Sequence, residues 1–205
     1  MIIVGASGHA VEVLQCLPAQ EWATLVFYDD VTPGEMGKLL NYFTVLRTPE
    51  AGQAHLARDP RFILGLGGPQ LRERLAMRFR GWGGRLTSVV AASATLGPFA
   101  ELGESLNVMQ YALISPTARL GEGVLLNAGA AVHHDARVGP YCEISPGARV
   151  LGRCQVGAGC QIGAHAIVLP DLVLGDGVRV GAGAVVTKSV PAGATVAGVP
   201  ARVLG

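Results

Sequence analysis

An aliphatic residue recurs at every sixth position through the second half of the chain. Counting in sixes from Val90 meets only valine, isoleucine and leucine, seventeen times in succession: Val90, Leu96, Leu102, Val108, Ile114, Leu120, Leu126, Val132, Val138, Ile144, Val150, Val156, Ile162, Val168, Leu174, Val180 and Val186. A period of six fits neither a helix nor a simple alternating strand. It predicts a parallel β-helix, in which three six-residue sides close a coil of 18 residues and successive coils stack ~4.8 Å apart.

The other positions of the repeat agree with a narrow core. Glycine directly follows the aliphatic residue in eight of the seventeen repeats, and we interpret these glycines as turn residues with a backbone conformation costly for other residues. Four places after the aliphatic residue stands a small or aliphatic residue, among them Cys142, Cys154 and Cys160. We expect these cysteines to be small buried hydrophobes. The alternative is a nucleophilic or metal-binding thiol.

The first part of the chain has a different pattern. Strand candidates at residues 2–4, 25–28, 43–46 and 62–66 alternate with helical segments near 10–17, 49–58 and 69–80. Such alternation predicts a small parallel α/β unit. We therefore expect a Rossmann-like domain over residues 1–86 and a β-helix over residues 87–205, with the glycine cluster 81–84 as the linker.

Composition excludes several classes of function. The chain has 205 residues and a net charge of +1, which gives no electrostatic footprint for nucleic acid or an anionic membrane. No apolar run reaches the ~18 residues of a membrane span. The start lacks the basic region of a secretory signal, and the four cysteines lack the spacing of a disulfide scaffold. We expect a reduced, cytoplasmic protein.

A glycine-containing turn, Gly5 to His9, joins the first strand to the first helix. Such a turn is where parallel sheets bind phosphate groups or nucleotides. The third glycine of the dinucleotide fingerprint is missing, so the pattern favours a mononucleotide portion over a dinucleotide cofactor. Ser7 does not stand in the nucleophile elbow of hydrolases.

The order of these parts resembles one family. The repeats, the segment 181–191 (GAGAVVTKSVP) and the segment 196–202 (VAGVPAR) are similar to the C-terminal half of hexapeptide-repeat acyltransferases. The front turn GASGHA, the pair Asp29 and Asp30, and the segment 131–135 (AVHHD) are similar to its sialic acid O-acetyltransferase-like branch, which includes N-acetyltransferases of nucleotide-linked amino sugars. The resemblance implies a left-handed parallel β-helix, a homotrimer of chains side by side, and acetyl-CoA between neighbouring β-helices.

The resemblance also implies the catalytic residues. His134 matches the general base and Asp135 the acidic neighbour that raises its basicity. An amine or hydroxyl that attacks a thioester must lose a proton, and an imidazole near neutral pH is suited to accept it. Gly152 follows His134 by one full coil, so its amide is expected beside the base as an oxyanion donor. His133 leaves an ambiguity. We expect the neighbours to point to opposite faces of a strand, so that only His134 reaches the thioester.

The resemblance divides the remaining candidates between donor and acceptor. Ala164 and Ala182 match positions along the pantetheine arm, and Lys188 and Arg202 are candidates for the coenzyme A phosphates. Position 143 is often a histidine that contacts the coenzyme arm; here it is Glu143, which stays a candidate donor residue. The sugar-nucleotide candidates are Ser7, Gly8, His9, Asp29, Asp30 and Gly67. No metal is implied.

We therefore expect an acetyl-CoA-dependent N-acetyltransferase that acts on a nucleotide-linked amino sugar in glycan biosynthesis. The alternative is O-acetylation of a sugar such as sialic acid. A zinc-dependent hexapeptide protein is another alternative, and it would need three histidines that meet between chains. The repeat contains three, His133, His134 and His165, but proteins of that class lack such a front domain. A trimeric scaffold with a sensor domain is the non-enzymatic alternative.

Overall fold

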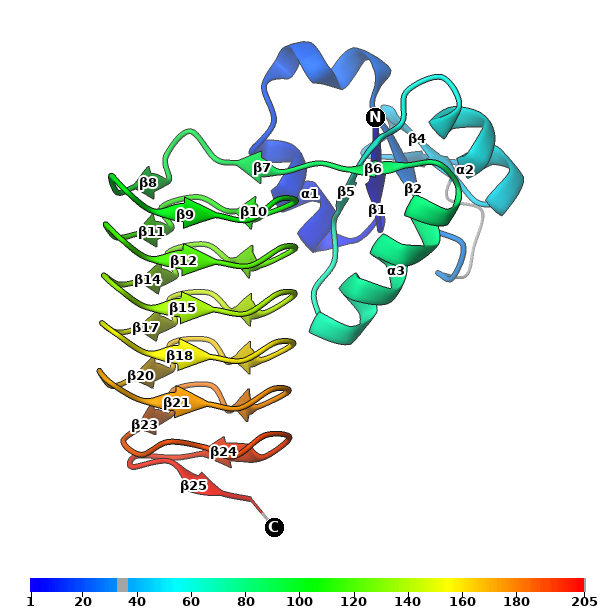
Figure 1. Cartoon of the computed structure of the whole chain (residues 1–205). Helices are drawn as coiled ribbons and strands as arrows, with labels where there is room; N and C mark the ends of the chain where they lie inside the picture. The colour runs from blue at the N-terminus through cyan, green and yellow to red at the C-terminus, as the bar shows by residue number, and fades with distance from the viewer. Residues whose placement is uncertain (33–36, 205) are drawn as a thin grey trace.

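The computed structural model describes residues 1–32 and 37–204. It contains a small α/β domain followed by a parallel β-helix, with the α/β domain beside the first coils and the C-terminal end at the far end of the stack (Figure 1). Among the described residues, no helix is both long and apolar enough to cross a membrane.

The α/β domain has one sheet in the order β3-β4-β2-β1-β5-β6. All its strand pairs are parallel except β3 with β4. The elements are β1 (Ile2–Val4), α1 (Gly8–Gln15), the 3₁₀ helix η1 (Ala19–Thr24), β2 (Val26–Tyr28), β3 (Lys38–Leu39), β4 (Phe43–Leu46), α2 (Pro49–Leu56), β5 (Arg61–Leu64), α3 (Pro69–Gly81) and β6 (Arg85–Leu86). The expected strands and helices are confirmed to within two residues.

The predicted linker is wrong. Helix α3 ends at Gly81, and the N–H of Gly84 donates to the carbonyl of Phe79, so the glycine cluster closes the helix. Strand β6 then joins the first sheet beside β5. The chain passes to the β-helix only through Thr87 and Ser88, because β7 begins at Val89.

The β-helix has three faces, each a parallel sheet of short strands paired in an 18-residue register. The first face contains β7 (Val89–Val90), β10 (Asn107–Val108), β13 (Leu125–Leu126), β16 (Glu143–Ile144), β19 (Gln161–Ile162), β22 (Arg179–Val180) and β24 (Thr195–Ala197), with β25 (Arg202–Val203) antiparallel at its end. The second contains β8 (Thr95–Leu96), β11 (Leu113–Ile114), β14 (Ala131–Val132), β17 (Arg149–Val150), β20 (Ile167–Val168) and β23 (Val185–Val186). The third contains β9 (Glu101–Leu102), β12 (Arg119–Leu120), β15 (Arg137–Val138), β18 (Gln155–Val156) and β21 (Val173–Leu174).

The repeat positions form the core as predicted. From Val108 onward the aliphatic residues of the repeat are buried, whereas Val90, Leu96 and Leu102 of the first coil remain about 40% exposed at the open end of the stack. Cys142, Cys154 and Cys160 are fully buried among these aliphatic side chains, and all three thiols are free. They occupy the small position that the pattern assigned to them.

The role of the repeat glycines is corrected by the structure. The glycine after each aliphatic residue does not have a positive φ; a Cβ at Gly139, for example, would lie 2.6 Å from the backbone of Gly157 in the next coil. These glycines let adjacent coils approach. The left-handed backbone conformation falls two places later, at Gly129 and Gly147, and also at Thr117 and Asp135.

Candidate active site

His134 lies in the corner that follows the second face, where β14 ends at Val132. Its side chain is 53% exposed, and its Nδ1 lies 2.9 Å from Oδ2 of Asp135. The hydrogen bond to His134 lowers the pKa of the Asp135 carboxyl, so this carboxylate is ionised at neutral pH. Nε2 of His134 has no hydrogen-bond partner within residues 1–32 and 37–204. The pair therefore presents a free imidazole nitrogen to solvent.

Thr117, one coil before Asp135 in the same corner, completes this arrangement. The backbone N–H of Asp135 donates to Oγ1 of Thr117 at 3.2 Å, and Oγ1 lies 2.8 Å from Oδ1 of Asp135 and 2.5 Å from the Pro116 carbonyl. The hydroxyl has one proton for two acceptors, and the charged carboxylate is the stronger one. The sequence analysis missed Thr117. The 18-residue spacing from Asp135 is the signal that could have found it.

Gly152 stands one coil beyond His134, as the spacing predicts. A Cβ at Gly152 would lie 2.6 Å from both Cε1 and Nε2 of His134, so any other residue here would displace the ring from its present position. Its backbone N–H donates to none of the described groups. The equivalent positions on either side of this pair are Pro116 and Pro170, which have no N–H to offer. The free Gly152 N–H beside the His134 ring therefore has no counterpart at Pro116 or Pro170, the equivalent positions in the adjacent coils.

His133 differs from His134 in its surroundings. Burial, with smaller contributions from Arg149 and His134, lowers the pKa of His133, and its Nε2 is buried without a partner among the described residues. Both histidines lie in the turn after β14 and are not neighbours within a strand. The expected alternation along a strand therefore does not distinguish the two histidines. They differ in exposure, because the His134 side chain is exposed and the His133 ring is partly buried.

The predicted donor residues do not gather around His134 within one chain. Ala164 and Ala182 stand one coil apart in the corner that follows the first face, where the N–H of Gly183 donates to the carbonyl of Ala164. His134 lies in the corner after the second face. Lys188 is in the His134 corner, three coils further on, and lines a hollow of about 260 Å³ together with Arg202.

Glu143 faces the α/β domain. Its side chain is only 8% exposed, and its carboxylate accepts hydrogen bonds from the N–H of Gly68 at 2.7 Å and from the hydroxyl of Ser145 at 3.2 Å. A Cβ at Gly67 would lie 3.0 Å from the same carboxylate. The structure thus places Glu143, which we expected to contact acetyl-CoA, beside Gly67, which we expected to contact the sugar nucleotide.

A second hollow, of about 560 Å³, opens at the carboxyl ends of β1 and β2. Ser7, Asp29 and Asp30 line it, together with Tyr28, Leu66, Leu71, Arg74 and Arg78. Gly8 and His9 begin α1 and do not line it; Nδ1 of His9 lies 3.1 Å from the Glu12 carboxylate. Gly67 adjoins the lining residue Leu66.

Both aspartates of this hollow are already held in place. Asp29 accepts hydrogen bonds from the N–H groups of Val31 and Thr32 and from the Thr32 hydroxyl. Burial alone would raise its pKa, but these hydrogen bonds outweigh burial and lower the pKa of Asp29. The Asp29 carboxylate is therefore ionised, and its hydrogen bonds close the turn that follows β2.

Asp30 is paired with a stacked cation. Nη2 of Arg78 lies 2.7 Å from Oδ2 of Asp30, and its guanidinium carbon lies 4.6 Å from the ring centre of Trp82. Burial would raise the pKa of Asp30, and the hydrogen bonds from Arg78 and Tyr28 outweigh it, so the pKa is lowered. This end of the hollow offers a charged donor and a charged acceptor side by side.

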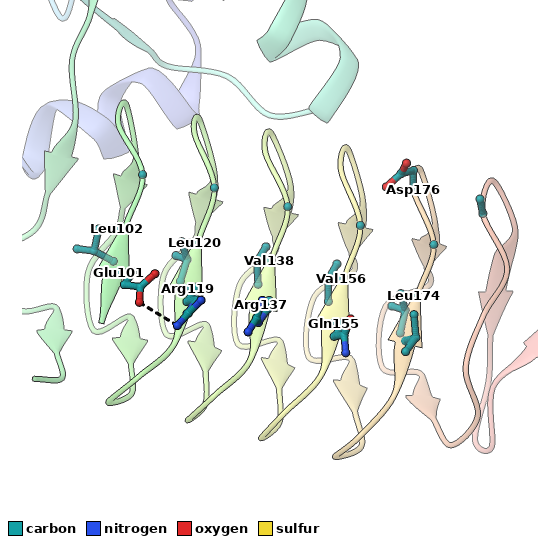
Figure 2. Close-up of a pocket in the computed structure, with 17 residues that line it drawn as sticks. Glu101, Leu102, Arg119, Leu120, Arg137, Val138, Gln155, Val156, Leu174 and Asp176 are labelled. Carbon is teal, nitrogen blue, oxygen red and sulfur yellow. Dashed lines mark ion pairs between the residues drawn. The ribbon is translucent and has the colours of Figure 1, made fainter. Parts of the chain in front are cut away.

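The third face carries a hollow of about 810 Å³. Figure 2 shows its outward residues in a row, with Glu101 and Arg119 joined by an ion pair and Arg137 and Gln155 on the following coils. None of the predicted site residues lines it. Within the described ranges, no group of three His, Cys, Asp or Glu side chains could hold a metal ion.

Comparisons with known proteins match the N-terminal part and the repeat part of the chain to two separate family models. Residues 1–79 match the family model of the PglD N-terminal domain, and residues 117–152 and 153–188 match the bacterial transferase hexapeptide model. The acetyltransferase domain of PglB from Neisseria gonorrhoeae FA1090, solved with acetyl coenzyme A, is 31% identical, with 99% of this chain and 98% of that chain covered and a TM-score of 0.83. The chain belongs to this family of hexapeptide-repeat acetyltransferases. Its fold is therefore a Rossmann-like domain followed by a left-handed parallel β-helix.

Two further structures resemble this acetyltransferase over its whole length. PerB from Caulobacter crescentus, solved in complex with CoA and GDP-perosamine, is 28% identical, covers 100% of this chain and 96% of its own, and has a TM-score of 0.86. WeeI from Acinetobacter baumannii AYE is 25% identical, with both chains fully covered and a TM-score of 0.62. No curated protein sequence matches the chain.

Proposed function

We propose that the protein transfers the acetyl group of acetyl-CoA to the amino group of a nucleotide-linked amino sugar. The observation that carries this proposal is the His134–Asp135 pair, whose free Nε2 lies against Gly152 in a chain that resembles PerB over its full length. PerB was solved with CoA and an amino-sugar nucleotide, which favours an amine acceptor over the hydroxyl of sialic acid.

In this mechanism the acceptor nitrogen attacks the thioester carbonyl carbon directly. A C–N bond forms, and the proton leaving the nitrogen moves to Nε2 of His134. Asp135 stabilises the resulting imidazolium through Nδ1. The backbone N–H of Gly152 donates to the oxyanion of the tetrahedral intermediate. The C–S bond then breaks, and the imidazolium returns its proton to the coenzyme sulfur.

The donor site is proposed to lie between copies of the chain in a homotrimer. Ala164 and Ala182 lie on a different corner from His134, so a single chain cannot bring all of them to one thioester. A neighbouring β-helix set beside the first would bring the two kinds of corner together. Lys188 and Arg202, which share one hollow, would then bind the coenzyme phosphates.

The acceptor is assigned to the hollow beside β1 and β2. Ser7 and the start of α1, with Gly8 and His9, form the turn at its edge, and Asp29 and Asp30 provide the fixed carboxylates for the nucleoside. Gly67 adjoins Leu66, which lines this hollow. The four free cysteines fit a reducing compartment, so we assign the reaction to the cytoplasm.

A binding and turnover experiment tests the proposal. Wild-type protein is titrated calorimetrically with acetyl-CoA and with UDP-, GDP- and dTDP-linked 4-amino sugars, and thiol release is then measured for each pair. We expect one nucleotide class to bind and its amine to gain one acetyl group by mass spectrometry. Acetylation of sialic acid hydroxyls in place of the amine would support the O-acetyltransferase alternative, and binding without turnover would support the scaffold.

A further inference from the structure

The loop after β5, residues 65–68, is held from outside its own domain. Nδ2 of Asn107 donates to the carbonyl of Leu64 at 2.8 Å, and the carboxylate of Glu143 accepts the N–H of Gly68 at 2.7 Å. Asn107, Leu125 and Glu143 are successive outward residues of the first face, paired one coil apart. All three are buried under the α/β domain. The β-helix therefore forms a hydrogen bond at each end of this loop, one through Asn107 and one through Glu143, and Leu125 lies between these two side chains.

Arg72 of α3 closes the same network from the other side. Its Nη1 donates to the carbonyls of Leu66 at 2.9 Å and Leu64 at 3.3 Å, and its Nη2 donates to the carbonyl of Gly123 in the β-helix at 3.2 Å. The side chain is fully buried. Burial lowers the pKa of Arg72 to about 10, so the guanidinium stays charged at neutral pH. A buried cation with several carbonyl partners fixes the backbone around it, because losing a partner leaves a charge without solvation.

Glu143 and His134 belong to the same coil. They are nine residues apart, which is half of an 18-residue coil, so they lie on different sides of the stack and differ in height by about half a coil spacing, ~2.4 Å. Rotation about an axis parallel to the stack preserves height. In a side-by-side trimer, the His134 corner of each copy would therefore lie within about 2.4 Å of the height of Glu143 in its neighbour. A slip of one coil would change this height by ~4.8 Å, whereas a misplacement of ~1 Å can already cost about 10²-fold in rate.

We propose that Glu143 is a positioning residue for the acceptor: with Asn107 and Arg72 it holds the loop 65–68, and so the acceptor pocket, at the level of His134. This inference rests on the proposed function, because it assumes an acceptor bound beside Leu66 and Gly67. It replaces the expected contact of Glu143 with coenzyme A by a contact with the acceptor loop.

Kinetics of three variants test the assignment. Glu143→Ala removes the acceptor of the Gly68 N–H, Glu143→Gln keeps an oxygen there, and Gln161→Ala alters the next outward residue of the same column. We expect Glu143→Ala to raise the acceptor KM about tenfold or more and to lower kcat, with the Kd for CoA within twofold of wild type. Glu143→Gln should recover most of the acceptor KM, and Gln161→Ala should match wild type.

Amide hydrogen exchange provides a readout that does not depend on turnover. The Gly68 N–H should exchange at least tenfold faster in Glu143→Ala than in wild type and should stay protected in Glu143→Gln. If the wild-type protein acetylates none of the amino-sugar nucleotides, the proposed function is refuted. The exchange data would still test whether Glu143 holds the loop 65–68. A weaker Kd for CoA with an unchanged acceptor KM, or unchanged Gly68 exchange, would overturn the assignment. Glu143→Asp, whose shorter side chain withdraws from Gly68, replaces the alanine variant if that variant fails to fold.

Discussion

At the scale of single residues, the reactivity of this corner depends on His134 being exposed and held. Its Nδ1 is committed to Asp135, and its ring lies against Gly152. Replacing His134 by Ala removes the base, so kcat should fall by ~10²–10⁴. The melting temperature should change little, because the side chain is 53% exposed and contributes little to the core. Steady-state release of coenzyme A and thermal melting measure both quantities.

His133 serves as the matched control for this variant. His133→Ala removes a half-buried ring whose nitrogen has no partner in the described part of the chain. Its kcat should stay within about tenfold of wild type. A folded His134→Ala protein with near-normal kcat, beside an inactive His133→Ala protein, would reverse the roles assigned to the two histidines.

Thr117 is a β-branched residue at φ 62°, a conformation that costs such residues roughly 1–2 kcal/mol. Its hydroxyl contacts Asp135, so we expect this strain to serve the active site and not the fold. Thr117→Gly should keep or raise the melting temperature while lowering kcat about 10- to 150-fold, the effect of one hydrogen bond to a charged group. Thr117→Ser should retain the activity. Equal losses of stability and activity in Thr117→Gly would contradict a positioning role.

At the scale of secondary-structure elements, the two kinds of repeat glycine predict different costs of substitution. A Cβ at Gly139 would meet the backbone of Gly157 at 2.6 Å, whereas a Cβ at Gly129 would meet nothing within 4 Å. Gly139→Ala must push two coils apart and should cost ~2–3 kcal/mol as overpacking does. Gly129→Ala should cost ~1–2 kcal/mol, the price of a left-handed backbone. Chemical denaturation of both variants would show whether this order holds.

The connection from α2 to β5 predicts an acid-sensitive element. Asp59 accepts hydrogen bonds from Nε and Nη2 of Arg61 at 3.0 and 2.8 Å, and this guanidinium holds its pKa well below its usual range. A depressed carboxyl pKa stabilises the folded state above the unfolded pKa of ~3.9, and the stabilisation is lost as the pH falls. Asp59→Asn should therefore melt about 2–4 °C below wild type at pH 7. The two melting curves should begin to converge as the pH falls below about 4, and they should meet only at the strongly acid pH at which the folded-state carboxyl is also protonated. A constant difference at every pH would contradict this.

The strands and the core of the β-helix could be predicted because each depends on local pattern. The period of six determines which side chains point inward, and this holds from Val108 to Val186. The function of the repeat glycines could not be read in the same way. Both a close approach and a positive φ select glycine, and only the neighbouring coil, such as Gly157 above Gly139, tells them apart.

At the scale of the whole molecule, the position of the predicted donor residues on two corners predicts a trimer. Analytical ultracentrifugation should give a species of three times the 21.2 kDa chain mass, independent of concentration in the micromolar range. Acetyl-CoA should stabilise this species, since a ligand bound between copies favours their association. A stable 21.2 kDa monomer with full activity would contradict the placement of the donor site.

The arrangement of the two domains was beyond the sequence pattern. Asn107 and Glu143 occupy outward positions, where a polar residue is usually solvated, and their burial follows only from the docked α/β domain. The family resemblance indicated the His134 corner, whose contacts with Asp135, Thr117 and Gly152 lie within adjacent coils. It assigned Glu143 to the coenzyme and did not indicate the contact with Gly68, which is 75 residues away in the sequence.

The 18-residue register also determines how the molecule comes apart. Within the β-helix each coil pairs with the coils before and after it, so its stability is a sum of neighbour terms, as in other stacked repeats. The coils that carry Asn107, Leu125 and Glu143 also contact the α/β domain, whereas none of the described residues after Gln161 shares a hydrogen bond or a core cluster with the described part of that domain. Unfolding should therefore begin at the C-terminal coils and proceed toward the docked ones, in steps that no single two-state transition describes. The coil that contains His134 belongs to the part that unfolds last.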